Sequence, residues 1–356
     1  MSAPERPILA LTQGDPAGIG PEILLKLLSG AGSQAWQPLL VAERAALEAL
    51  RPVLPDAPWE RLTYLASLSK REDLAAFADP NGPIAVLDPI GDPNRPVAFG
   101  HSGAHDAAGA MAALDCGIEL ARTGVADALV TAPIAKSSIA KYHRADFVGH
   151  TDYLAEVCGL ERYGRDYLMA FLAPDLQVAL LTVHMPLRDA LDAVTPEAIL
   201  LALQCLDRHA GGKIALAGLN PHAGEGGLLG AEDESLLAPT VAQARNQGLD
   251  VHGPESADSL FARARQGEFD WVLALYHDQG LIAVKTACFG LATNWTLGLP
   301  FLRTSVDHGT AFGIAGQGKA DAGPIEKVVE TTLELIAGRL PRKSTPTTSR
   351  DGIPAE

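Results

Sequence analysis

The chain of 356 residues is 47% hydrophobic and 20% charged, which is typical of globular proteins and excludes a disordered chain. Its length suits one large unit or two lobes, and we expect two. The formal net charge of −15 argues against nucleic acid as a partner, so any anionic ligand must be held by a local cluster of basic side chains.

Short apolar runs alternate along the chain with stretches of helical periodicity. The predicted strands are 7–12, 37–42, 126–132 and 176–183, and three later runs, 211–220, 270–277 and 280–287, read as buried strands that enter polar loops. The predicted helices are 21–28, 43–50 and 196–206, with a Lys-rich segment after residue 132. This alternation predicts an α/β fold with ligands at the carboxyl ends of strands.

The first apolar run is too short for a signal peptide or a membrane span, so we expect a cytoplasmic protein with no membrane partner. Residues 341–356 are rich in Ser, Thr, Pro and charge, and are predicted to form a frayed, disordered tail. The four cysteines are far apart in a large chain and are interpreted as reduced core thiols: Cys116, Cys158, Cys205 and Cys288.

Three histidines, His184, His222 and His277, each follow a predicted buried strand. Neutral imidazole binds zinc and similar divalent ions, and three protein ligands with open positions make a catalytic site. A single such histidine is more often a hydrogen-bonded side chain, but three in Gly- and Pro-rich loops favour a metal centre. Asp278 and Asn220 are either ordinary turn residues or groups that orient the rings or contact substrate.

A second cluster is cationic and comprises Lys285, Asn294 and Arg303 in a largely apolar context. It predicts a bound phosphate or carboxylate, with two solvated surface charges as the alternative. The Gly149–Thr151 turn precedes a helical stretch and predicts Thr151 as its N-cap, where free backbone N–H groups bind anions.

Two Gly-rich segments lack the standard nucleotide fingerprints. Residues 13–22 match neither G-x-G-x-x-G nor the Walker motif, and a tight turn into a helix with Pro21 at its first position explains them. Residues 307–321 are either a plain loop or a loop that wraps a nucleotide through backbone contacts.

Together these stretches resemble the 4-hydroxythreonine-4-phosphate dehydrogenase family of vitamin B6 biosynthesis. The resemblance covers most of the chain and is carried, in the family's order, by GDPAGIGPE, TAPIAK, GHTDYLAE, TVHMPLRD, GLNPHAGEGG, YHDQGL, TLGLPFLRTSVDHGTA and IAGQGKAD. It implies an isocitrate/isopropylmalate dehydrogenase-like α/β fold and a homodimer with a shared active site. The implied first lobe, on the NAD side, is 1–133 plus 297–340, and the second, with metal, substrate and dimer interface, is 134–296.

The resemblance also implies the site residues. One divalent ion, zinc or alternatively cobalt, manganese or magnesium, would be held by His184 and His222 of one subunit and by His277 of the partner subunit. The substrate contacts would be His150, Thr151, Asp258, Lys285, Asn294 and Arg303, with Lys285 and Asp278 as candidate catalytic residues. NAD or NADP would be held by His308, Gly309, Thr310, Gly316 and Gly318.

The implied reaction is oxidation of 4-phosphooxy-L-threonine at C3 and decarboxylation to 3-amino-2-oxopropyl phosphate, in pyridoxal 5'-phosphate biosynthesis. Departures from the family pattern around Ala292 and Trp295, and in the stretch GGLLGAEDE, bear on the substrate. Phosphorylated threonate or erythronate and an aromatic cis-dihydrodiol carboxylate are therefore alternatives. Rivals from other classes are a phosphate acyltransferase and a non-catalytic metal-dependent binder.

Overall fold

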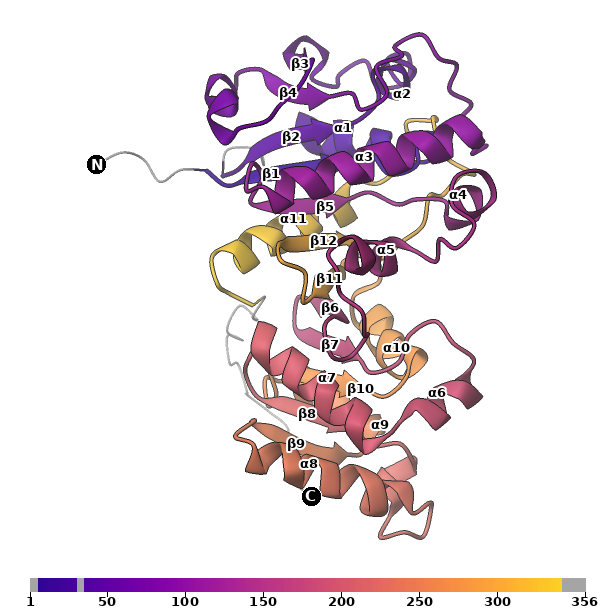
Figure 1. The fold of residues 1–356 in the computed structure, drawn as a ribbon, viewed down its shortest axis with the longest axis vertical. Helices are drawn as coiled ribbons and strands as arrows, with labels where there is room; N and C mark the ends of the chain where they lie inside the picture. The colour runs from indigo at the N-terminus through magenta and orange to yellow at the C-terminus, as the bar shows by residue number, and fades with distance from the viewer. Residues whose placement is uncertain (1–5, 31–34, 341–356) are drawn as a thin grey trace, which may run out of the picture.

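The computed structural model describes residues 6–30 and 35–340, and in this part of the chain one twelve-stranded sheet forms the centre of the molecule (Figure 1). The strand order is β3-β4-β2-β1-β5-β12-β11-β6-β7-β10-β8-β9. The strands are β1 (Ile8–Thr12), β2 (Gln37–Val41), β3 (Leu62–Leu65), β4 (Ile84–Leu87), β5 (Ala128–Thr131), β6 (Leu168–Ala173), β7 (Leu176–Leu180), β8 (Ile214–Ala217), β9 (Val251–Glu255), β10 (Trp271–Ala274), β11 (Thr293–Leu297) and β12 (Leu302–Val306). The predicted α/β fold is confirmed.

Strand direction changes only in the middle of the sheet. From β3 to β12 neighbouring strands are parallel, β11 is antiparallel to both β12 and β6, β6 is antiparallel to β7, and β7, β10, β8 and β9 are parallel again. The inner parallel strands are short, mostly apolar and buried on both faces, as a sheet covered by helices on each side requires, whereas the edge strands β3 and β9 are largely only partly buried.

Helices cover both faces of the sheet. They are α1 (Gly20–Ser29), α2 (Arg44–Glu48), α3 (Ala104–Arg122), α4 (Lys136–Tyr142), α5 (His150–Val157), α6 (Leu187–Ala193), α7 (Pro196–His209), α8 (Ala238–Asn246), α9 (Ala257–Arg265), α10 (His277–Cys288) and α11 (Gly323–Ile336). Buried apolar side chains form a layer on each face of the sheet in each half. In the half that contains β1 to β5, one layer lies under α1 and α11 and the other lies under α3. In the other half, one layer lies under α7 and α8 and the other lies under α9 and α10.

The sheet runs without a break through both predicted lobes, so the division into 1–133 plus 297–340 and 134–296 stays a prediction. The proposed tail at 341–356 lies outside the described residues. In residues 6–30 and 35–340 no helix has the length and apolarity to span a bilayer.

Three local predictions are corrected by the structure. Residues 280–287 lie in α10 and do not form a strand: Leu281 and Val284 face the core while Ile282 is 65% exposed, a helical pattern that a short apolar run conceals. Gly149 is the N-cap of α5, and Thr151 lies inside the helix. The four cysteines are free, but only Cys205 is a fully buried core thiol, and the other three are partly exposed.

Candidate active site

A cavity of about 390 Å³ lies over the middle of the sheet. One row of paired residues forms its floor: Thr131 of β5 pairs with Ser305 of β12, which pairs with Asn294 of β11, which pairs with Phe171 of β6. The walls come from the loop after β5, the first turns of α4 and α5, helix α10, His184 beyond β7 and the loop after β12. In Figure 1, α4, α6 and α10 lie toward the right of the view, beyond the central strands.

Nine of the predicted site residues line this cavity, and the others do not. Those that do are His150, Thr151, His184, His277, Lys285, Asn294, Arg303, His308 and Gly309. Those that do not are His222, Asp258, Asp278, Thr310, Gly316 and Gly318.

Arg303 is the most unusual side chain in the cavity because it is only 1% exposed and has no acidic partner among the described residues. Its guanidinium donates to the hydroxyls of Thr296 at 3.1 Å and Thr131 at 2.6 Å, and its Nε has no acceptor. Burial lowers the pKa of Arg303 to about 9. A buried cation with spare donors is strongly destabilising unless an anion joins it, so this geometry fits phosphate or carboxylate.

His150 and the first turn of α5 lie beside Arg303. Burial lowers the pKa of His150 well below its ordinary value, and the charges of Arg303 and Lys136 lower it further. The imidazole is therefore neutral near pH 7 and acts as a hydrogen-bond partner. Gly149 and Thr151 line the same wall, where α5 begins, and a helix N-terminus favours an anion through its free N–H groups.

The lining of the cavity also contains two imidazoles from one chain. The ring centroids of His184 and His277 are 5.4 Å apart. Nδ1 of His277 lies 2.7 Å from the carboxylate of Asp278, an arrangement that fixes the ring and leaves Nε2 free. Burial lowers the pKa of His184, with Lys136 and His277 as further causes, so this ring is in the neutral form that metals bind.

His222 is placed apart from this pair. It lies in the short helical turn Pro221–Gly224, with a side chain 60% exposed and Nδ1 3.8 Å from the carboxylate of Asp258. Asn220 bonds the carboxylates of Glu232 and Asp233, so it supports the loop and does not orient a ring. In the described part of the chain, no group of three or more His, Cys, Asp or Glu side chains is arranged to hold a metal. One chain thus contributes two neighbouring imidazoles, which fit part of a metal centre.

The Gly-rich loop after β12 begins in the cavity and then packs against the start of α1, in the half of the sheet that contains β1 to β5. The backbone N–H of Ile19 donates to the carbonyl of Thr310. The buried carboxylate of Glu22 accepts from the N–H groups of Gly318 at 3.3 Å and Ala320 at 2.7 Å, and pairs with Lys26 at 3.1 Å. The segment GDPAGIGPE is therefore more than a tight turn, because it holds this loop in place.

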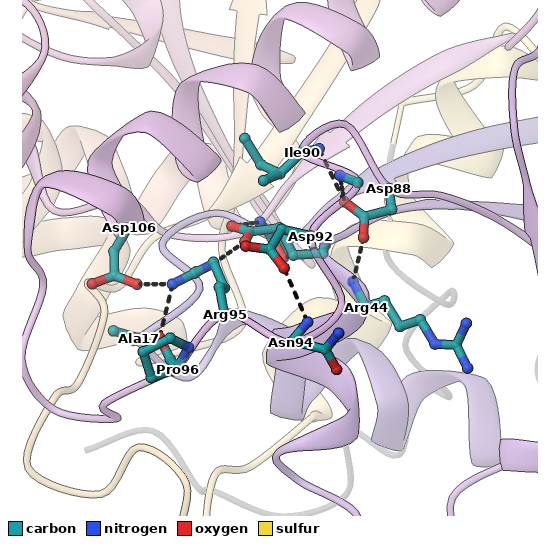
Figure 2. A network of polar contacts seen from close by, with 12 residues as sticks. Ala17, Arg44, Asp88, Ile90, Asp92, Asn94, Arg95, Pro96 and Asp106 are labelled. Carbon is teal, nitrogen blue, oxygen red and sulfur yellow. Dashed lines mark hydrogen bonds and ion pairs between the residues drawn. The ribbon is translucent and has the colours of Figure 1, made fainter.

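A third loop, residues 88–103, packs on the same pair of loops. The guanidinium of Arg95 lies between the carboxylate of Asp106, at 3.1 Å, and that of Glu43, with the carbonyl of Pro96 also in reach (Figure 2). Glu43 bonds Gln13, which directly precedes GDPAGIGPE. A Cβ atom at Gly309 or Gly313 would meet no other atom within 4 Å, so the three-loop assembly leaves open space beside these two glycines.

Sequence reasoning missed three charged residues of the cavity: Lys136, Asp152 and Asp307. Asp307 pairs with Lys285 at 3.3 Å. Asp152 occupies the first turn of α5, where acidic residues are common for reasons unrelated to ligands, and Lys136 is one of two lysines in α4, so no local signal marked either residue.

Comparison with known proteins gives a consistent result. The family model described as pyridoxal phosphate biosynthetic protein PdxA matches residues 34–332. The 4-hydroxythreonine-4-phosphate dehydrogenase of Acidithiobacillus ferrooxidans is 39% identical over 94% of this chain and 97% of its own. A putative D-threonate 4-phosphate dehydrogenase of Symbiobacterium thermophilum is also 39% identical, over 93% and 97%. The crystal structure of 4-hydroxythreonine-4-phosphate dehydrogenase from Klebsiella pneumoniae superimposes with a TM-score of 0.81, at 34% identity, over 93% and 99%.

Proposed function

The chain belongs to the PdxA family of pyridoxal phosphate biosynthetic proteins, and we propose that its cavity oxidises 4-phosphooxy-L-threonine at C3 with NAD or NADP. The predicted family and the isocitrate/isopropylmalate dehydrogenase-like fold class are confirmed. The observation that carries the substrate proposal is that one cavity is lined both by the buried guanidinium of Arg303, which has no acidic partner in the described residues, and by the two adjacent imidazoles.

The chain's own residues would divide the work by their positions. Arg303, neutral His150 and the N-terminus of α5 would bind the phosphate. This anchor directs the C3 hydroxyl toward His184 and His277, and the binding energy of the remote phosphate is used to orient the reacting carbon.

Two carboxylates would position the side chains that face the reacting carbon. Asp307 fixes the ammonium of Lys285, which can then donate to a substrate oxygen, and Asp278 orients His277. His184 and His277 would hold a zinc-like divalent ion, and the loop 308–318 a nicotinamide dinucleotide. When bound, the ion lowers the pKa of the substrate hydroxyl and the nicotinamide accepts the hydride from C3. The β-keto acid formed loses carbon dioxide and, after protonation, is 3-amino-2-oxopropyl phosphate.

We propose that the site is shared in a homodimer, with a different division of ligands from the one the resemblance implied. His184 and His277 are neighbours within one chain, so the ligand that a second copy supplies is His222 of the partner subunit, with its neighbour Asp258. Apolar side chains are exposed near the imidazole pair, on and beside α6 and α10: Met185, Leu187, Leu191 and Ile282. A second copy would cover them.

Two experiments test the proposal. Purified protein with NAD or NADP and added zinc is expected to form reduced cofactor from 4-phosphooxy-L-threonine, and a chelator is expected to stop it. An acyltransferase would form none under any condition, and a non-catalytic binder would take up metal and ligand without turnover. Mixing the inactive variants His184→Ala and His222→Ala should restore part of the activity, because with this division of ligands a mixed dimer contains one intact site; no recovery after subunit exchange would argue against this division.

A second candidate substrate is D-threonate 4-phosphate. It is favoured by the equal identity of the chain to the Symbiobacterium thermophilum relative. A panel that compares kcat/KM for the two substrates, for erythronate 4-phosphate and for a cis-dihydrodiol carboxylate decides between them.

A further inference from the structure

Two exposed leucines lie on the loop that carries His222. Leu228 is 80% exposed and Leu229 is 44% exposed, and both belong to the stretch GGLLGAEDE, residues 226–234. No residue of this stretch lines the cavity that contains Arg303, so the stretch takes no part in the proposed substrate site of its own chain. A single exposed leucine is ordinary on a protein surface, but two in succession beside a proposed metal ligand indicate a site of interaction.

Backbone hydrogen bonds join the leucines to the turn that contains His222. The N–H of Leu229 donates to the carbonyl of Gly224 at 3.0 Å, and the N–H of Leu228 donates to the carbonyl of Glu225 at 3.3 Å. The N–H of Glu225 in turn donates to the carbonyl of His222 at 3.2 Å. Because the ring and the leucines are parts of one hydrogen-bonded loop, a surface that receives the imidazole of His222 also comes close to both leucines.

A second cavity, of about 410 Å³, lies beside the imidazole pair and is called the apolar cavity below. His184, His277 and Asp278 contribute to its lining. The remaining lining residues are mainly apolar: Val183, Met185, Pro186, Leu187, Ala190 and Tyr276. Met185 is 42% exposed and Leu187 is 55% exposed, so the apolar cavity is open to solvent in a single chain. It can therefore receive apolar side chains from another molecule.

A groove between α9 and α10, called the central groove below, connects His222 with the apolar cavity. At one end it is lined by Asp258, whose carboxylate lies 3.8 Å from Nδ1 of His222. It is also lined by Tyr276 and Asp278, which the apolar cavity shares. One face of the chain therefore carries His222, the central groove and the apolar cavity with its imidazole pair, in this order.

A twofold axis through the central groove reverses this order on the partner subunit. The stretch after His222 runs toward the segment that precedes α8, because an added Cβ at Gly227 would lie 3.6 Å from the carboxylate of Glu234, and neither leucine lines the central groove. The leucines are therefore on the far side of His222 from the axis. When His222 meets the imidazole pair of the partner subunit, the leucines meet the apolar cavity of the partner subunit.

We propose that Leu228 and Leu229 of one subunit bind in the apolar cavity of the partner subunit and thereby hold His222 against the partner's imidazole pair. This inference rests on the homodimer of the proposed function and identifies the contact that assembles it. The contact removes the leucines from water together with Met185 and Leu187, and burial of apolar area stabilises association. The stretch GGLLGAEDE, which the sequence pattern connected with the substrate, then determines subunit contact.

The substitution Leu228→Asp tests the leucine side of the contact. It places a charge in an apolar cavity, and the twofold symmetry makes the effect occur twice in each dimer. The Kd of the dimer, measured by sedimentation velocity over a range of protein concentrations, should rise by about 100-fold or more. Because Leu228 is 80% exposed in a single chain, the circular dichroism spectrum should not change. Ile90→Asp, at a 40% exposed position in the other half of the sheet, is the control and should change the Kd by less than about threefold.

A double substitution tests whether the two surfaces meet each other. Leu187→Lys, on the receiving side, should weaken the dimer when it is made alone. Combined with Leu228→Asp it places opposite charges across the same contact, and the dimer should be at least about tenfold tighter than in Leu228→Asp alone. In a second assay, Leu228→Cys with Leu187→Cys should give covalent dimers with a short bifunctional maleimide. Leu228→Cys with Ile90→Cys, and each single variant, should give only the background of the native cysteines.

The outcomes separate this inference from the proposed function. A wild-type protein that stays monomeric, a dimer that Leu228→Asp does not weaken, or a double variant without recovery or cross-linking overturns the inference. None of these measurements needs substrate or cofactor, so they remain decisive if the protein fails to oxidise 4-phosphooxy-L-threonine, a result that overturns only the proposed function. Where the protein is active, the activity of Leu228→Asp should return as its concentration is raised, because mass action restores the dimer. A loss that does not depend on concentration contradicts the contact.

Discussion

The substitution Arg303→Met should make the ligand-free protein more stable while it removes phosphate binding. Arg303 is a buried cation without an acidic partner in the described residues, and methionine fills a similar volume without charge. Burial lowers the pKa of Arg303 from 12.5 to about 9, and at about 1.4 kcal/mol per tenfold change this corresponds to at most about 5 kcal/mol of destabilisation by the charge.

The net gain is smaller because the two threonine hydroxyls lose their donor. Each lost hydrogen bond costs about 1 kcal/mol, and water in the cavity reduces the charge penalty. The remaining increase in the free energy of unfolding is about 1–3 kcal/mol, within the range found when buried ionic groups are replaced by apolar ones. Inorganic phosphate at a hundredfold excess over its Kd should stabilise the wild-type protein by about 2.7 kcal/mol and the variant hardly at all.

Urea denaturation followed by circular dichroism, with and without phosphate, measures both effects. Arg122→Met is the control, because Arg122 is an exposed arginine that pairs with Glu119 on the surface, and its replacement should change stability by less than about 0.5 kcal/mol. The reasoning is refuted if Arg303→Met is no more stable than the wild type, or if phosphate still stabilises it to the wild-type extent.

Two further predictions concern stability and the cofactor loop. Glu22→Ala leaves the N–H groups of Gly318 and Ala320 without their acceptor and removes the ionic partner of Lys26. It should cost about 2–4 kcal/mol and weaken NAD binding in fluorescence titration; exposed Glu60→Ala is the control, and equal losses in both would contradict the anchoring role. The second prediction concerns His150, whose pKa is lower in the folded than in the unfolded chain. The unfolded chain therefore binds the proton preferentially. As a result, the free energy of unfolding falls as the pH drops below 6.5, by up to about 1.4 kcal/mol per pH unit. His150→Gln should lose less stability than the wild type between pH 7.5 and pH 5 in urea denaturation, and parallel losses would show that His150 is not the group responsible.

The sequence was sufficient for features that a local pattern determines. Strands β1, β2, β5, β7, β8 and β10 were predicted because each is a short apolar run followed by Gly, Pro or polar residues, and His184 and His277 were placed correctly at strand ends for the same reason. Residues 280–287 were assigned to the wrong element because Leu281 and Val284 lie in a run that is apolar throughout, which hides the helical spacing.

Contacts between distant segments could not be predicted in this way. Arg303 reaches the hydroxyl of Thr131 because β12 pairs with β5, although the two residues are 172 positions apart. Lys136 and Asp152 line the cavity only because the fold brings the starts of α4 and α5 to it, and neither position carries a motif. The proposed division of the histidines between two subunits is a similar case, since spacing along the chain says nothing about which rings meet.

The backbone of His222 gives an independent reason to place this residue in a shared site. Its φ of 53° and that of Ala223, 51°, lie in the left-handed region, where a residue other than glycine costs about 1–2 kcal/mol. The loop is held in this shape by the buried carboxylate of Asp233, which accepts from the N–H groups of Leu219 and Asn220 at 2.8 and 3.0 Å. Nothing that His222 contacts within its own chain accounts for this support, because the side chain is 60% exposed and does not line the cavity. It is expected for a ligand that must be presented, in a fixed direction, to the site of a second subunit.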